Sequence, residues 1–167
     1  MSTHQTLPQK PPVKTARVRG RRQLHFDSLA QMSADAEQLA AAKQIEALGN
    51  WTLGQALDHL AISMNLSIDG AKARVPLPVR LIAPLFKKRI LKRSMSAGFK
   101  TFRPYDPRPD VAPAEGVARM KAAIDRLAEN PHREPHIIFG RMSREEYDQL
   151  HLRHAELHLS FFRPLES

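Results

Sequence analysis

The sequence predicts an all-α protein: a four-helix bundle with one long basic crossover that contains a short extra helix. Four segments carry apolar residues at helical spacing, and hardly any segment shows the alternation typical of a strand. Prolines and basic residues fill the stretch between the second and third of these segments. A chain of 167 residues suits one compact domain. We expect residues 23–167 to form that domain and residues 1–22 to form a disordered basic arm.

The first two predicted helices have clear start and stop signals. Asp27 is a suitable N-cap for a first helix, which we expect to run to a stop at Gly49-Asn50. Thr52 and Gln55 form a capping box at the start of the second helix, in which each side chain bonds the other residue's backbone amide. We expect the second helix to end at Gly70, because glycine is the usual residue at a helix C-terminus.

The last two helices are delimited in the same way. The third is expected to run from Pro113, which suits a first helical turn, to Asn130-Pro131. The fourth begins with a second capping box at Ser143-Arg144-Glu145-Glu146 and runs to about Phe162. Within the crossover, the stretch from Val79 to Leu91 predicts the short extra helix, which is amphipathic.

The positive charge of the chain is concentrated in two segments. Lys and Arg number 26 against 17 Asp and Glu, a net charge of +9. Residues 1–26 hold six basic residues and residues 71–105 hold ten, and neither segment contains an acid. These segments favour an anionic partner such as nucleic acid or anionic lipid, whereas the rest of the chain is slightly acidic. The absence of a known reading motif argues against specific nucleic-acid recognition.

Several classes of protein are excluded by composition. The chain has no cysteine, so it has no disulfide framework, no thiolate metal site and no cysteine nucleophile. No stretch approaches the roughly 18 apolar residues of a membrane-spanning helix. The N-terminal segment lacks the apolar run of a secretory signal. We therefore expect a soluble, cytoplasmic protein in which any metal is held by nitrogen and oxygen ligands.

Three of the eight histidines fall on one face of the fourth predicted helix. His151, His154 and His158 are spaced i, i+3 and i+7 and share that face with apolar residues. Two imidazoles at i, i+4 spacing, such as His154 and His158, can bind one divalent ion together. His59 on the second helix is the natural candidate for the third ligand, because facing helices of a bundle supply such groups, and helical periodicity permits this assignment without requiring it. For His151, a role in orienting a ligand, a place in the pocket and a role as alternative ligand all stay open.

The remaining histidines divide into one pocket candidate and three surface residues. His136 lies in the loop just before the fourth helix, near the start of that helix, and is a candidate pocket residue. His4, His25 and His132 lie in the arm or in loops, where we expect solvated side chains.

Two acids and one tryptophan adjoin the predicted ligands. Asp58 and Glu156 are possible proton shuttles, but each follows or precedes a ligand position and therefore points elsewhere on its helix. Surface positions, or roles in orienting a ligand, suit them better. Trp51 is expected to staple the start of the second helix and not to line a pocket.

Several stretches of the chain resemble a known superfamily. The stretch from Asn50 to Ala61, NWTLGQALDHLA, resembles the W-[ST]-x-x-[QE]-x-x-x-H-[LI] signature of the DinB-like (YfiT-like) four-helix-bundle superfamily. The stretch HIIFG, the second capping box and His154-x-x-x-His158-Leu159 resemble the H-P-x-F-G … H-x-x-H-H-L pattern of a subfamily known only as a domain of unknown function. The resemblance covers roughly residues 20–163. Ile137 and Leu157 depart from that pattern, where the subfamily has Pro and often His.

The resemblance implies a function as well as a fold. The superfamily's metal triad falls on His59, His154 and His158, and its divalent ion is commonly zinc or nickel. Characterised relatives include S-transferases and isomerases that use low-molecular-weight thiols. We therefore expect a metal-binding protein, a transferase or hydrolase that activates a water or such a thiol for a small-molecule substrate.

A second hypothesis gives the function to the basic segments. In this alternative the protein is a non-enzymatic stress-response or binding module whose crossover and arm meet anionic partners. The two hypotheses combine if the crossover covers the metal end of the bundle, where its Lys and Arg side chains would clamp an anionic substrate. The sequence leaves a homodimer open.

Overall fold

The computed structural model describes residues 11–165 and is mostly helical. These residues form five α-helices: α1 (Leu29–Ala41), α2 (Leu53–Asp69), α3 (Leu77–Lys92), α4 (Pro113–Glu129) and α5 (Arg144–Leu159). They also form two short 3-10 turns, η1 (Thr15–Arg17) and η2 (Arg103–Tyr105), and two short strands, β1 (Ile45–Ala47) and β2 (Phe162–Pro164). The predicted all-α class agrees with this composition, apart from the two strands.

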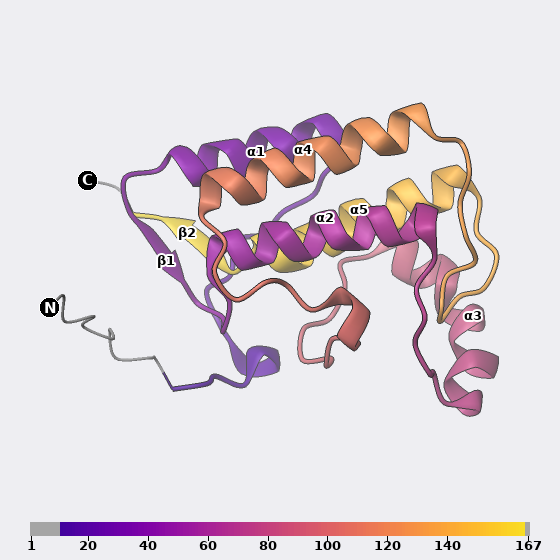
Figure 1. Ribbon diagram of the computed structural model, residues 1–167. Coiled ribbons are helices and arrows are strands. Elements are labelled where there is room, and N and C mark those ends of the chain that lie inside the picture. The colour runs from indigo at the N-terminus through magenta and orange to yellow at the C-terminus, as the bar shows by residue number, and fades with distance from the viewer. Residues whose placement is uncertain (1–10, 166–167) are drawn as a thin grey trace, which may run out of the picture.

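Four of the helices pack in two layers. Helices α1 and α4 lie side by side in one layer, and α2 and α5 lie in the other (Figure 1). Across the core, α2 contacts α4 and α1 contacts α5, and apolar side chains of all four helices meet there. Fully buried side chains at this centre include Met32, Leu39, Leu57, Leu60, Met64, Met120, Leu127 and Leu159. Helix α3 lies outside the two layers, beside α5.

Both predicted capping boxes are confirmed. At the start of α2, Thr52 Oγ1 accepts from the Gln55 amide at 3.2 Å, and Gln55 Oε1 accepts from the Thr52 amide at 3.0 Å. Ser143 and Glu146 exchange the same two hydrogen bonds at the start of α5. The predicted third helix and the extra helix also agree with α4 and α3 to within two residues. Capping side chains act over one turn, so the sequence alone locates these helix starts.

The predicted first helix is too long. Its N-cap is Ser28, whose Oγ accepts from the Gln31 amide, and not Asp27. Helix α1 ends at Ala41, and β1 follows and pairs antiparallel with β2, with Ala47 opposite Phe162. The predicted fourth helix overruns for the same reason, because β2 begins at the residue where that helix was expected to end. Pairing between segments this far apart in the chain has no local signal.

The described part of the predicted basic arm lies against the body of the protein. Residues 1–10, including His4, lie outside the described residues. Arg22 donates two hydrogen bonds of 2.7 Å to the Asp35 carboxylate, and its backbone amide donates to the Ser160 carbonyl. Asn50 exchanges two hydrogen bonds with the backbone of Val13. Residues 11–22 are thus tied to α1 and to the ends of α2 and α5.

Within residues 11–165, none of the helices combines the length and the apolar character needed to cross a membrane.

Candidate metal centre

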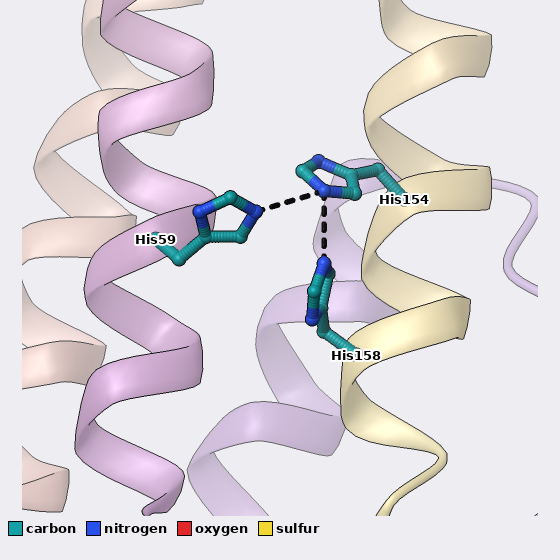
Figure 2. A group of neighbouring side chains, drawn as sticks. All are labelled: His59, His154 and His158. Carbon is teal, nitrogen blue, oxygen red and sulfur yellow. Dashed lines mark hydrogen bonds between the residues drawn. The ribbon is translucent and has the colours of Figure 1, made fainter. Parts of the chain in front are cut away.

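Three histidines from two facing helices converge at one point between α2 and α5. His154 Nε2 lies 3.0 Å from His59 Nε2 and 3.0 Å from His158 Nε2 (Figure 2). One nitrogen atom from each of the three rings can be chosen so that all three atoms lie within 4.8 Å of one another. His59 is buried, and His154 and His158 are partly buried. The structure therefore brings together the three residues that the sequence nominates.

The orientation of the His59 ring is set by its second nitrogen. His59 Nδ1 lies 2.6 Å from the backbone carbonyl of Tyr105 in η2. A carbonyl only accepts hydrogen bonds, so Nδ1 carries the hydrogen and the Nε2 lone pair faces His154. The loop that follows η2 is held in turn by Asp58, whose Oδ2 accepts from the Arg108 amide at 2.9 Å. Such partners of a ligand's far nitrogen fix its tautomer and its direction.

The three imidazoles are neutral near pH 7. Burial lowers the pKa of His59, against an opposing effect of its bond to the Tyr105 carbonyl. Burial also holds the pKa values of His154 and His158 well below 6.5, and the neighbouring imidazoles lower them further. Neutral rings keep the lone pairs that a metal ion requires.

The donor set fits a divalent ion. A neutral imidazole carries one hydrogen, and His154 Nε2 faces two other nitrogens at 3.0 Å. His59 Nε2 has no hydrogen, so a hydrogen bond between His59 and His154 requires the hydrogen to be on His154 Nε2. That nitrogen then has no lone pair with which to accept from His158, so one of the two contacts is left without a hydrogen bond of its own. A cation accepts all three lone pairs. Tetrahedral zinc with imidazole ligands at its usual bond length separates them by about 3.3 Å. The observed spacing is close to this value, so the group can hold a metal ion.

The cluster forms part of the wall of a cavity of about 940 Å³. Cavities that bind small molecules have volumes of about 300–1,000 Å³ and mostly apolar linings. Trp51 lines this cavity, with its ring stacked on His158 at 5.2 Å between centroids and 4.8 Å from His59. The prediction that Trp51 does not line a pocket is therefore wrong. Its side chain contacts one ring from α2 and one from α5, so its position depends on how these two helices pack together.

A second group of polar side chains lines the cavity away from the three-histidine cluster. His136 Nδ1 accepts from the amides of Ile138 and Phe139 at 3.2 Å, so its Nε2 carries the hydrogen. His151 Nε2 lies 3.3 Å from Ser67 Oγ, whose own hydrogen goes to the Met64 carbonyl. His151 thus donates from Nε2 and keeps an acceptor lone pair on Nδ1. It belongs to the pocket and not to the three-histidine cluster.

Ser63 adds an unpartnered hydroxyl to this lining. Its side chain is buried, lines the cavity, and has no hydrogen-bond partner in the described chain. Ser63 and Ser67 follow His59 at i+4 and i+8, so they share its helix face. This i, i+4, i+8 spacing is the signal in the sequence that identifies both serines as candidate pocket residues.

The crossover, residues 71–105, does cover the cavity. Val79, Ala83, Ile90 and residues 95–102 line it. Lys100 is the one basic residue of the crossover that takes part in this lining. The remaining Lys and Arg side chains are therefore not placed to clamp a substrate inside the cavity.

The prediction of a surface position is wrong for Asp58 and Glu156, because both are buried. Asp58 Oδ1 lies 2.6 Å from Arg119 Nε, which ties α2 to α4. Glu156 pairs with the equally buried Arg153 at 2.8 Å and accepts from the Phe26 amide at 2.7 Å. The chain before α1 covers the outer face of α5, which sequence periodicity assigns to solvent.

The two described histidines expected at the surface are exposed. The side chains of His25 and His132 are 65% and 59% accessible. His132 Nε2 lies 2.8 Å from the carboxylate of Glu134, and His132 is not a member of the three-histidine cluster.

Acidification is expected to destabilise the protein between pH 6.5 and about 4. Burial lowers the pKa of His136 from 6.5 to about 4 and that of His151 to about 3. Below pH 6.5 the unfolded chain binds protons at these rings while the folded protein does not. The free energy of unfolding therefore decreases as the pH is lowered. Each ring contributes at most about 1.4 kcal/mol per pH unit.

Urea unfolding across this range, with a chelator present so that metal loss plays no part, measures the effect. His136→Gln, which retains an acceptor for the two amides, is expected to reduce the pH dependence. Stability that stays level on acidification through this range would contradict the buried, neutral state of both rings.

The fold and the site together define a class: a mostly helical protein with a three-histidine cluster, able to hold a metal ion, in the wall of a large cavity. The model of the family described as "Protein of unknown function (DUF1569)" matches residues 18–165. The chain belongs to this family, and the predicted membership of a domain family of unknown function is confirmed. No curated protein and no solved structure matches the chain significantly.

Proposed function

We propose that this protein is a divalent-metal enzyme with the four-helix bundle of the DinB-like superfamily. In this proposal His59, His154 and His158 hold zinc or nickel, and the adjoining cavity takes a small-molecule substrate. The observation that carries the proposal is the convergence of three neutral imidazole nitrogens in a cavity wall, with His154 Nε2 3.0 Å from each of the other two. Three protein ligands are the usual number in catalytic zinc sites.

The bound ion would supply Lewis-acid activation, lowering the pKa of a coordinated water or low-molecular-weight thiol. The chain's own residues have separate tasks. The Tyr105 carbonyl holds the His59 ring in the tautomer that binds through Nε2. His136 Nε2 and His151 Nδ1 present a donor and an acceptor to a polar group of the substrate. Trp51, stacked on His158, shields one side of this ligand from water.

The lining of the cavity favours a substrate with an apolar body and few charges. Phe99, Phe102, Phe139 and Phe161 are among the residues that line it. The charged residues of the lining are Lys100 and Asp106, and the histidines there are neutral. Transfer to or from a low-molecular-weight thiol is the reaction that the DinB-like resemblance favours, and hydrolysis is the alternative at the same site.

Metal analysis of the purified full-length protein tests the proposal. We expect about one equivalent of zinc or nickel per chain, removable with a chelator and restored on reloading. Cobalt substitution gives a second readout, because the visible absorption of Co²⁺ reports a tetrahedral nitrogen site without any assay of activity. Less than about a tenth of an equivalent after loading with either metal would end the proposal.

A further inference from the structure

Helix α3 exposes most of the large apolar side chains found on the surface. Leu77, Leu81 and Leu85 are 65%, 67% and 81% accessible, and Val79, Ile82 and Phe86 are also exposed. Elsewhere in residues 11–165 only Phe99 and Leu165 are large, apolar and exposed to this degree. Leu91 is the one buried residue among the sixteen of α3. A contiguous exposed apolar surface of this kind marks a binding surface.

The inner side of α3 is already occupied. Leu91, with Ala83 and Ile90, packs in a small apolar cluster with Phe139, Tyr147 and Leu150. Lys87 on the same side pairs with Glu146 of α5 at 2.8 Å. The other apolar side chains named above are exposed, and α3 itself lies outside the two layers of packed helices (Figure 1).

The outer side of α3 changes from apolar to basic along its length. Leu77, Leu81 and Leu85 follow one another at i, i+4 and i+8, and Lys88 and Lys92 continue the same side of the helix. Arg89 and Arg93 continue the neighbouring row that begins with Ile82. All four of these basic side chains are exposed. The helix thus presents an apolar N-terminal part followed by a basic C-terminal part.

The charged residues of the crossover itself are all of one sign. The crossover contains ten basic residues and no acid. Lys87 is the only one of the ten with an ion pair in the described chain, and the other nine are exposed. Unpaired basic side chains beside exposed leucines complement a surface that offers anionic groups at its edge and hydrocarbon beneath them.

We propose that α3 docks this protein, without spanning, on a membrane surface that contains anionic lipids. Acyl chains receive the leucine and phenylalanine side chains, and lipid phosphates or carboxylates receive the Lys and Arg side chains. A nucleic acid satisfies the charges but not the aliphatic side chains, which gain nothing from a polar groove. This inference is independent of the proposed metal chemistry, because the outer side of α3 does not include the three-histidine cluster.

Vesicle co-sedimentation of the full-length protein tests the docking. We expect binding to vesicles of phosphatidylcholine with phosphatidylserine, weakened by added salt, and little binding to phosphatidylcholine alone. The double variant Leu81→Ser/Leu85→Ser and the double variant Lys88→Glu/Arg89→Glu are each expected to lose at least about tenfold in affinity. Lys43→Glu, an exposed charge reversal far along the chain from α3, is the matched control and is expected to retain most of the binding.

Insertion of the helix has its own readout. Leu85 is largely exposed, so Leu85→Trp leaves the packing intact and places a fluorophore on the outer side. Relative to the wild-type protein, we expect its added emission to shift to the blue with anionic vesicles and to stay unchanged with phosphatidylcholine. Circular dichroism checks that every variant is folded.

Three results would overturn the proposal. One is the absence of binding to the anionic vesicles, and another is binding that both double variants retain. The third is a stable wild-type dimer in light scattering that Leu81→Ser/Leu85→Ser converts to monomer, because a second copy of the chain would then cover the outer side of α3.

Discussion

Replacing His154 with alanine is expected to abolish metal binding at the three-histidine cluster. His154 is the central member of the group, because its Nε2 contacts the nitrogens of both His59 and His158. Loss of a partner that only orients a ligand already costs about 10–100-fold in metal affinity. Loss of a ligand itself is therefore expected to cost more than about 100-fold. Competition with a chelator of known affinity measures the change for zinc and for nickel.

Two further variants make this result specific. His132→Ala removes an exposed imidazole outside the cluster and is expected to keep the wild-type affinity. His151→Ala tests the three roles that the sequence leaves open for this residue, because a pocket residue that neither binds nor orients the metal can be removed with less than about a tenfold effect on metal affinity. Wild-type metal affinity in His154→Ala would rule out the cluster as the binding site. A loss in His151→Ala as large as in His154→Ala would make His151 a ligand.

Replacing Gly54 with alanine is expected to destabilise the fold by about 3 kcal/mol. A Cβ atom at this position would lie 1.8 Å from the carbonyl oxygen of Val111, which belongs to the backbone just before α4 and cannot rotate away. Gly116 on α4 is close in the same way, with its Cβ position 2.8 Å from Leu57 Cβ. Alanine is favoured over glycine in a helix by about 1 kcal/mol. The steric term exceeds this gain, so α2 and the start of α4 have to move apart.

Chemical denaturation near pH 7 measures the loss, and Gly140→Ala is the matched control. Gly140 has φ +69, but a Cβ atom there has no heavy atom within 4 Å. This second variant therefore carries a conformational cost of about 1–2 kcal/mol without a clash. We expect the Gly54 variant to be the less stable of the two. Equal stabilities would show that α2 does not approach the 111–112 backbone as closely as described.

Local signals in the sequence predict much of the helical framework. The two capping boxes and the C-terminal Gly70 locate α2 and the start of α5 because their hydrogen bonds act within one helical turn. The i, i+4 spacing likewise puts His154 and His158 side by side without reference to any other element. The ends of the first and fourth predicted helices are predicted poorly, because the residues after them form the strands β1 and β2, which pair with each other across most of the chain.

The candidate site was predicted in part for the same reason. The three histidines of the cluster are predicted from spacing and resemblance. The roles of Trp51 and Tyr105 are not predicted, because their contacts with His59 depend on loops. Asp58 looks like a surface residue on its own helix until Arg119 of α4 and the Arg108 amide meet it. The periodicity of one helix does not show which other segments of the chain cover its polar side.

Residue type and spacing are thus sufficient to determine which helices form, which imidazoles share a face, and where the basic residues gather. The 3.0 Å convergence of His59 with His154, the tautomer of His59 and the outward direction of the α3 leucines depend on packing between segments far apart in the chain. Hydrogen bonds within one helical turn depend only on residues that are close together in the sequence. Distances between helices follow from how whole side-chain surfaces fit together, and no short stretch of sequence contains that information.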